Sequence, residues 1–419
     1  MTATREYDIV LYGATGFVGK LTAEYLARAG GDVRIALAGR STERLLAIRE
    51  TLGESAQSWP VLVADASSPS TLDAMAAQTR VVVTTVGPYS RYGLPLVAAC
   101  AAAGTDYADL TGEPPFIRDS IDLYHKQALD TGARIVHACG FDSIPSDLTV
   151  YALFRRARED GAGELLDTDL VVRSFAGGLS GGTLASMLEV LDAVSSDADV
   201  RRQFADPYTL TPDRNAEPEL GAQPDLRWRR GRQIAPELTG LWTAGFMMAP
   251  ANTRIVRRSN ALQDWAYGSR FRYSEHMSLG SSAVAPVASA IVNGVGNAVS
   301  GLGSRYFRLL PRHLVERVLP KPGTGPSETV RDRGHYKVET YTTTATGARY
   351  VATIAQRGDP GYKATSVLLG ESGLALATDR DQLSELRGVL TPAAAMGDAL
   401  LARLPVAGVS VETAKLAPR

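Results

Sequence analysis

A glycine-rich segment near the start of the chain has the residue types and spacing of a phosphate-binding loop. It reads Gly13-Ala14-Thr15-Gly16-Phe17-Val18-Gly19 and directly follows an apolar run at 8–12. Gly13 permits a tight turn, Gly16 lets backbone N–H groups approach a pyrophosphate, and Gly19 allows a helix to pack closely on a strand. The spacing therefore predicts a dinucleotide site. Its expected contact residues are Gly13, Thr15, Gly16, Phe17, Val18 and Gly19.

The end of the second apolar run indicates which dinucleotide binds. Arg40 and Ser41 stand where a protein specific for NAD usually offers a carboxylate to the ribose 2′-hydroxyl. Arg40 can instead bind a 2′-phosphate, with Ser41 as a second donor, so we expect NADPH as the cofactor rather than NADH. Asp65, after the third run, either meets the adenine or caps the turn that follows it.

The segment after the fourth apolar run is expected beside the nicotinamide. It reads Val86-Gly87-Pro88-Tyr89-Ser90-Arg91-Tyr92-Gly93. Gly87 and Pro88 form a loop of little bulk that can contact the cofactor. Tyr89 or Tyr92 could donate a proton to the substrate as hydride arrives. The alternative is that these two rings pack against the cofactor.

Two further loops are expected on the same rim, at 109–113 and 139–147. In the second loop, Asp142 and Ser143 are candidate catalytic residues that could face the nicotinamide. Pro145 suits the first turn of a helix, so part of this loop is also a helix start. The His and Cys residues lack metal-ligand spacing and no GxSxG elbow occurs, so we expect neither a metal nor a serine nucleophile.

The elements that must position these loops alternate along the first 150 residues. Short apolar runs predict strands at 8–12, 34–38, 61–64, 81–85, 107–109 and 134–137. Amphipathic patterns predict helices near 17–29, 42–52, 70–77, 94–103 and 116–131. This alternation is typical of an α/β fold with a doubly wound parallel sheet, whose ligand lies beyond the carboxyl ends of the strands.

The rest of the chain predicts a second, α+β domain. We place the dinucleotide domain at 1–150, a substrate or dimerisation domain at 151–360, and C-terminal helices that pack back on the first domain at 361–419. Within the second part, a helix is expected to about residue 158, a strand at 167–175 and a helix at 183–194. Residues 201–240 read as irregular structure, and 336–344 with 349–354 as a hairpin. A helix from about Pro392 is expected to precede a short tail.

Residues 277–304 carry no charge, although they are rich in Gly, Ala and Ser and contain Pro286. A full membrane span is therefore not expected. Arg305, Arg308, Arg312 and Arg317 follow at helical spacing. The region is read either as an element that contacts the membrane surface, or as a buried helix or homodimer contact followed by a solvated face.

Composition limits the class and location of the protein. The 419 residues are 45% hydrophobic and 21% charged, with a net charge of −1. This is the composition of a globular protein, and no global charge favours nucleic acid as a partner. Two cysteines cannot form a disulfide framework, and the first residues lack a signal-peptide pattern, so we expect a cytoplasmic protein.

Taken together, the motifs resemble those of the saccharopine dehydrogenase-like oxidoreductases, and most of all their mycobacterial branch of trans-acting enoyl reductases. The motifs are GATGFVG, AGRS, TVGPYSRYG, YADLTGE, GFDSIPSD, SGGT at 180–183 and GDPGY at 358–362. The resemblance covers nearly the whole chain. It implies a Rossmann domain that binds NADPH and a second domain that helps to bury the substrate.

The resemblance also implies a substrate and a partner. The substrate would be an enoyl group on a polyketide carried by a synthase, in the pathway to phthiocerol and phenolphthiocerol dimycocerosate lipids. The alternatives are a reductase of an imine or ketone on a small amino-acid-like molecule, and a membrane-associated protein that binds the cofactor without turnover. Incubation with NADPH and enoyl thioesters would separate the three.

Overall fold

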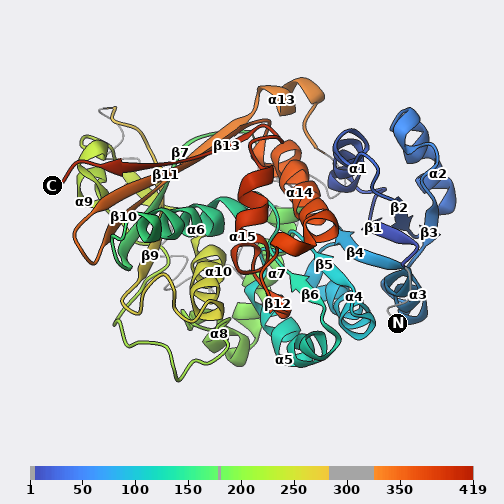
Figure 1. The fold of residues 1–419 in the computed structure, drawn as a ribbon, viewed down its shortest axis with the longest axis horizontal. Helices are drawn as coiled ribbons and strands as arrows, with labels where there is room; N and C mark the ends of the chain where they lie inside the picture. Colours follow the sequence, from blue (N-terminus) through green and yellow to red (C-terminus); the bar gives the residue numbers. More distant parts are fainter. Residues whose placement is uncertain (1–4, 178–180, 283–324, 419) are drawn as a thin grey trace.

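The computed structural model describes residues 5–177, 181–282 and 325–418 and arranges them around two β-sheets (Figure 1). The first sheet has seven parallel strands in the order β12-β6-β5-β4-β1-β2-β3. Its strands are β1 (Tyr7–Tyr12), β2 (Ile35–Gly39), β3 (Val61–Val63), β4 (Thr79–Thr84), β5 (Asp106–Ala108), β6 (Arg134–Val136) and β12 (Gly388–Leu390). The order of the first six strands is that of a doubly wound dinucleotide-binding sheet, as the sequence predicts.

Both faces of this sheet are buried. Ile9 and Leu11 of β1 belong to one apolar core, whereas Val10 and Tyr12 belong to another, because successive side chains of a strand point to opposite faces. Helices α1 and α14 cover the first face, and α3, α4 and α5 cover the second. Their bounds, with α2, are α1 (Phe17–Ala29), α2 (Thr42–Thr51), α3 (Pro69–Gln78), α4 (Tyr89–Ala103), α5 (Pro114–Thr131) and α14 (Thr365–Thr378).

The second sheet is mixed and has six strands in the order β13-β11-β10-β7-β9-β8. They are β7 (Leu165–Ala176), β8 (Thr243–Gly245), β9 (Arg272–Ser278), β10 (His335–Thr344), β11 (Arg349–Arg357) and β13 (Val409–Leu416). Strands β10 and β11 form the predicted hairpin, which turns through Gly347 at φ +83°. The remaining helices are α6 (Ile144–Glu159), α7 (Gly181–Ser196), α8 (Ala198–Ala205), α9 (Gly231–Ile234), α10 (Ala249–Leu262), α13 (Glu328–Arg333) and α15 (Pro392–Arg403).

Helix α6 joins the two lobes, each of which is built around one sheet. It starts in the loop after β6 and packs against β10, β11, α10 and α15. One apolar core contains both Ile9 of the first sheet and Ile354 of the second. The last part of the chain serves both lobes, since β12 pairs with β6 and β13 pairs with β11. The lobes are therefore held together by continuous packing.

Three expectations are corrected by the structure. Helix α4 begins at Tyr89 rather than at residue 94, so Tyr89 and Tyr92 lie on the first turn of a helix and not in a loop. The expected C-terminal tail is strand β13. Part of 201–240 is ordered as α8 and α9.

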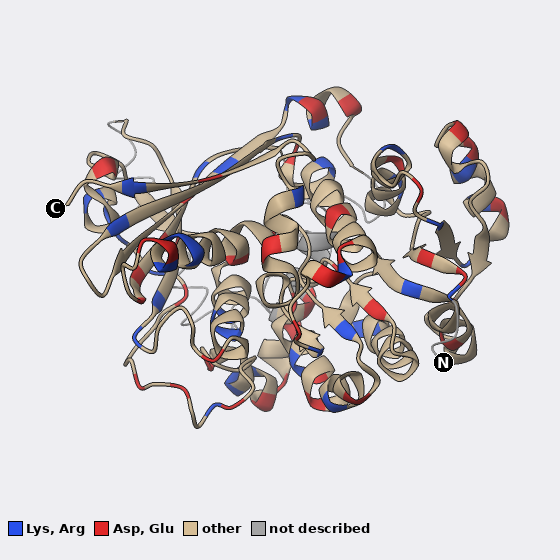
Figure 2. Cartoon of the chain, in the orientation of Figure 1, with Lys and Arg blue, Asp and Glu red and all other residues tan. Residues whose placement is uncertain are grey.

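The uncharged run at 277–304 lies mostly outside the described residues, as do Arg305, Arg308, Arg312 and Arg317. Its first two residues, Met277 and Ser278, end strand β9. Along the described ranges, no helix is long and apolar enough to cross a membrane. Acidic and basic residues alternate over both lobes in Figure 2, without a face of one sign in that view.

Candidate functional site

The glycine loop between β1 and α1 is held tightly against the sheet. Gly13 has φ +89°, its N–H donates to the Ala38 carbonyl at 2.9 Å, and its carbonyl accepts from Gly16 N–H at 2.9 Å. A Cβ added to Gly13 would lie 2.7 Å from Val86 Cγ2, and one added to Gly19 would lie 2.1 Å from the Gly13 oxygen. Two of the three glycines are therefore required by close packing within the loop.

Gly16 leaves the N-terminus of α1 accessible. It is exposed and caps the helix without a side-chain hydrogen bond. A Cβ there would meet only the Gly13 oxygen, at 3.3 Å. Thr15, Phe17 and Val18 are half-buried around it. The first N–H groups of α1 thus face outward at the positive end of the helix dipole, which is the geometry that binds a phosphate.

At the ends of β2 and β3, the side chains suit a phosphorylated ribose. Arg40 is exposed, and its guanidinium takes part in no hydrogen bond or ion pair among the described residues. The Ser41 hydroxyl accepts from Arg44 N–H at 3.3 Å and keeps its own proton for donation. A 2′-phosphate therefore fits Arg40 and Ser41, because both can donate to it.

Asp65 is engaged by its own turn. Its Oδ1 accepts from the Ser67 backbone at 2.9 Å and from the Ser67 hydroxyl at 2.8 Å. These hydrogen bonds, and more weakly the charge of Arg40, lower the pKa of the carboxyl. Of the two readings of Asp65, the structure shows the turn cap.

Gly87 and Pro88 connect β4 to α4 beside the glycine loop, with Gly87 exposed and Pro88 half-buried.

The first turn of α4 is capped by Glu113, a residue for which the sequence predicted no role. The buried Glu113 carboxylate accepts from Tyr89 N–H at 3.0 Å and Ser90 N–H at 2.9 Å. It also accepts from the Ser186 hydroxyl of α7, at 2.6 Å. Glu113 therefore fixes the start of α4 and ties it to α7.

The four candidate proton donors fall into two groups. Tyr89 is buried, its hydroxyl donates to the Thr84 carbonyl at 3.2 Å, and burial raises the pKa of this phenol well above 10. Ser143 is buried and donates to Asn252 Oδ1 at 2.8 Å. By contrast, Tyr92 is 45% exposed and Asp142 is half-buried. The structure thus separates two buried hydroxyls from an exposed phenol and a half-buried carboxyl.

Ser143 belongs to a buried polar chain that links the rim to the second lobe. Asn252 Nδ2 donates to Glu275 Oε2 at 3.1 Å, and the Tyr273 hydroxyl donates to Glu275 Oε1 at 2.8 Å. Burial raises the pKa of Glu275 to about 7. The partners of Ser143 come from α10 and β9, far along the sequence, so no local signal predicts them.

A second buried hydrogen-bond network, which the sequence did not predict, has the residue types of a catalytic triad. Asp109 Oδ2 lies 2.7 Å from His137 Nδ1, and His137 Nε2 lies 2.8 Å from the Ser120 hydroxyl. All three side chains are fully buried beneath Phe116 and its neighbours. Because no substrate can reach Ser120, the network stabilises the ends of β5 and β6. Asp109 and His137 directly follow the adjacent strands β5 and β6. This position is the sequence signal that could have predicted their contact.

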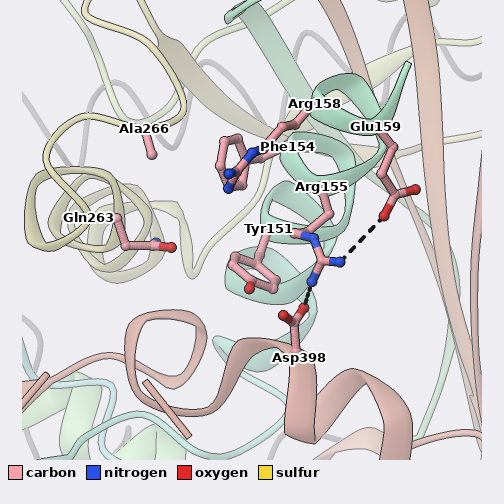
Figure 3. A pocket seen from close by; sticks show the side chains of 8 residues that line it. All are labelled: Tyr151, Phe154, Arg155, Arg158, Glu159, Gln263, Ala266 and Asp398. Carbon is pink, nitrogen blue, oxygen red and sulfur yellow. Dashed lines mark hydrogen bonds and ion pairs between the residues drawn. The ribbon is translucent and has the colours of Figure 1, made fainter. Parts of the chain in front are cut away.

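A cavity of about 640 Å³ lies elsewhere in the described structure (Figure 3). Its walls are the C-terminal half of α6, Gln263 and Ala266 just after α10, and Asp398 of α15. Arg155 projects from α6 and is bonded to Asp398 and, at 3.4 Å, to Glu159. Arg155 is about 16 Å along α6 from the rim at Ile144. We therefore assign the cavity no part in the dinucleotide site. Within the described ranges, no cluster of His, Cys, Asp or Glu side chains could hold a metal ion.

The parallel sheet, the open N-terminus of α1 and the uncommitted Arg40 define a dinucleotide-dependent oxidoreductase. Residues 9–136 match the saccharopine dehydrogenase NADP binding domain. The chain is 78% identical over 418 residues, all of both chains, to a protein of Mycobacterium tuberculosis named as a trans-acting enoyl reductase. It is 68% identical over 415 residues, 99% of both chains, to the trans-acting enoyl reductase of Mycobacterium bovis. The chain belongs to the trans-acting enoyl reductases of the saccharopine dehydrogenase-like family.

The fold likeness extends beyond these relatives. Saccharopine dehydrogenase of Saccharomyces cerevisiae aligns over 98% of this chain and 99% of its own, with a TM-score of 0.54 and 14% identity. This confirms the two-lobed architecture and, at that identity, nothing about the substrate.

Proposed function

We propose that the protein is an NADPH-dependent enoyl reductase that acts in trans on an acyl chain held by a polyketide synthase. The observation that carries the proposal is the full-length identity of 78% to a relative named for this activity. It covers both lobes, so the substrate-binding part is included as well as the dinucleotide domain. A substrate on the way to phthiocerol-type lipids is part of the proposal, as is a location in the cytoplasm with peripheral contact to the membrane.

NADPH fits the residues of the first lobe. The N–H groups after Gly16 would hold the pyrophosphate, and Arg40 with Ser41 would hold the 2′-phosphate. Gly87 and Pro88 would border the nicotinamide half, since they follow the central strand β4. When bound, NADPH supplies the hydride that is delivered to the β-carbon of the enoyl group.

The exposed hydroxyl of Tyr92, near the start of α4, is the better proton donor to the α-carbon. Asp142 lies in the loop that begins α6, and its role would be to orient a neighbouring group or to cap the helix. Tyr89 and Ser143 have engaged hydroxyls, so we give them the role of holding the rim in shape. Donors that stabilise the developing enolate would lower the barrier to hydride arrival.

The test is reduction of defined thioesters by the purified protein. Enoyl thioesters on acyl carrier protein, matched β-keto thioesters, and a keto acid with an amine would each be incubated with NADPH. We expect NADPH oxidation and a saturated acyl product with the enoyl thioester alone. Turnover of only the keto acid with the amine would instead identify an imine reductase, and the proposal would fail.

A further inference from the structure

The side chain of the first residue of α1 is in contact with a segment of the second lobe. The ring of Phe17, the first residue of α1, packs edge-on against Tyr362 with centroids 4.8 Å apart. A Cβ added to Gly325 would lie 2.4 Å from this ring. The guanidinium carbon of Arg331, on α13, lies 5.3 Å from the ring centroid. In Figure 1, α13 lies at the upper edge of the molecule, between the second sheet and α1. Three points on the second lobe thus converge on the dinucleotide loop.

Arg331 is a half-buried cation that lacks an ion-pair partner within the described ranges. Its Nη1 donates to the Pro326 carbonyl at 2.7 Å, and its own carbonyl accepts from Asp359 N–H at 2.8 Å. Two acids, Asp332 and Asp359, interact with the charge of Arg331 without forming an ion pair with it. Asp332 pairs with Lys363 Nζ at 2.5 Å, and Asp359 Oδ1 accepts from Lys363 N–H at 3.2 Å. The remaining guanidinium N–H groups are available.

An anion at the N-terminus of α1 would interact favourably with this cation. The open N-terminus of α1 already carries a partial positive charge, and Arg331 adds a full one beside its first residue. A pyrophosphate seated on the N–H groups of α1 would be the counter-ion of both.

We propose that Arg331 is a positioning residue for the pyrophosphate of NADPH, held beside the dinucleotide loop by its contact with Phe17. The proposal rests on the proposed function, since it requires NADPH at the glycine loop. It assigns to the second lobe a direct part in cofactor affinity.

The experiment compares Arg331→Ala with Arg333→Ala by titration of NADPH fluorescence. Arg333 is on the same helix, is exposed, and takes part in no hydrogen bond or ion pair among the described residues, so it is the matched control. We expect NADPH to bind about tenfold to hundredfold more weakly to Arg331→Ala and unchanged to the control, because a charge-assisted contact is lost. Arg331→Lys keeps the charge and should restore most of the affinity.

Adenosine 2′-monophosphate separates this effect from general damage to the site. It carries the 2′-phosphate and no pyrophosphate, so its affinity should be the same in wild type and Arg331→Ala. Equal NADPH affinity of Arg331→Ala and wild type would overturn the inference, as would equal loss of both ligands. If wild type itself bound no NADPH, the proposed function would fall and this inference with it.

Discussion

Arg40 is the side chain on which the choice between the two nicotinamide cofactors depends. It is exposed directly after β2 and has no hydrogen-bond or ion-pair partner among the described residues. We expect Arg40→Ala to weaken NADPH binding by about 1.5–3 kcal/mol while NADH affinity stays unchanged. Titration of both cofactors against both proteins measures this. A variant that still prefers NADPH by the wild-type margin would show that another residue reads the 2′-phosphate.

The candidate donors differ in burial, so their substitution is expected to affect either turnover or stability. Tyr92→Phe or Asp142→Asn should lower turnover by roughly a hundredfold at saturating NADPH, with little effect on stability. Tyr89→Phe should instead lower the unfolding free energy by about 0.5–1.5 kcal/mol, because its hydrogen bond to the Thr84 carbonyl is lost. Turnover assays and denaturant titrations on the same samples separate the two effects. Near wild-type turnover in both Tyr92→Phe and Asp142→Asn would place the proton donor in the second lobe or on the synthase.

The sequence predicts the conformation of the glycine loop better than it predicts the contacts of the candidate catalytic residues. The glycine loop could be predicted because its contacts are local. Each glycine lies close to atoms within six residues of it or at the end of the adjoining strand. The roles of Tyr89 and Ser143 depend on distant partners. Asn252, which accepts from Ser143, is more than a hundred positions away, and nothing in the local pattern indicates that it covers the hydroxyl.

Helix α4 depends on Glu113 for its first turn. We expect Glu113→Gln to lower the unfolding free energy by about 1.5–3 kcal/mol, because an amide offers one acceptor oxygen to donors that now share two. Ser186→Ala, which removes only the third hydrogen bond of this carboxylate, is the milder control and should cost about 1 kcal/mol. Equal losses in the two variants would mean that the contact with α7, rather than the helix cap, is what stabilises this region.

Among the secondary-structure elements, the strands and helices of the first 150 residues are predicted closely by the alternation of apolar runs with helical patterns. The later elements are harder because their partners are remote. Strand β12 has only three residues and joins β6 across some 250 positions, so no periodicity could reveal it. Strand β13 does carry a strand pattern, since Val409, Val411 and Thr413 occupy every second position. The segment between α15 and β13, however, gave no sign that another strand would follow.

For the whole molecule, two buried acids between the lobes make stability depend on pH. Burial raises the pKa of Asp147 and of Glu275 to about 7, whereas unfolded carboxyls titrate near pH 4. Between about pH 4 and 7 these two groups therefore bind more protons in the folded protein than in the unfolded chain, and their contribution to the unfolding free energy falls as the pH rises. Each acid contributes a slope of at most about 1.4 kcal/mol per pH unit.

Denaturant titrations across this range should show the fall and a plateau above about pH 7 from these two groups. Asp147→Asn keeps the shape of the side chain and removes one titration, so its curve should be flatter. A curve of Asp147→Asn that runs parallel to the wild-type curve from pH 4 to 7 would contradict this description of the inter-lobe core.

The most direct measurement for the whole account follows the hydride itself. The purified protein would reduce an enoyl thioester on acyl carrier protein with NADPH that carries deuterium at both hydrogen positions of nicotinamide C4, and the product would be analysed by mass spectrometry and NMR. The account predicts a saturated acyl chain with one deuterium at the β-carbon and a solvent proton at the α-carbon. An unlabelled product, or a deuterium on a carbinol or amine carbon of another substrate, would contradict it.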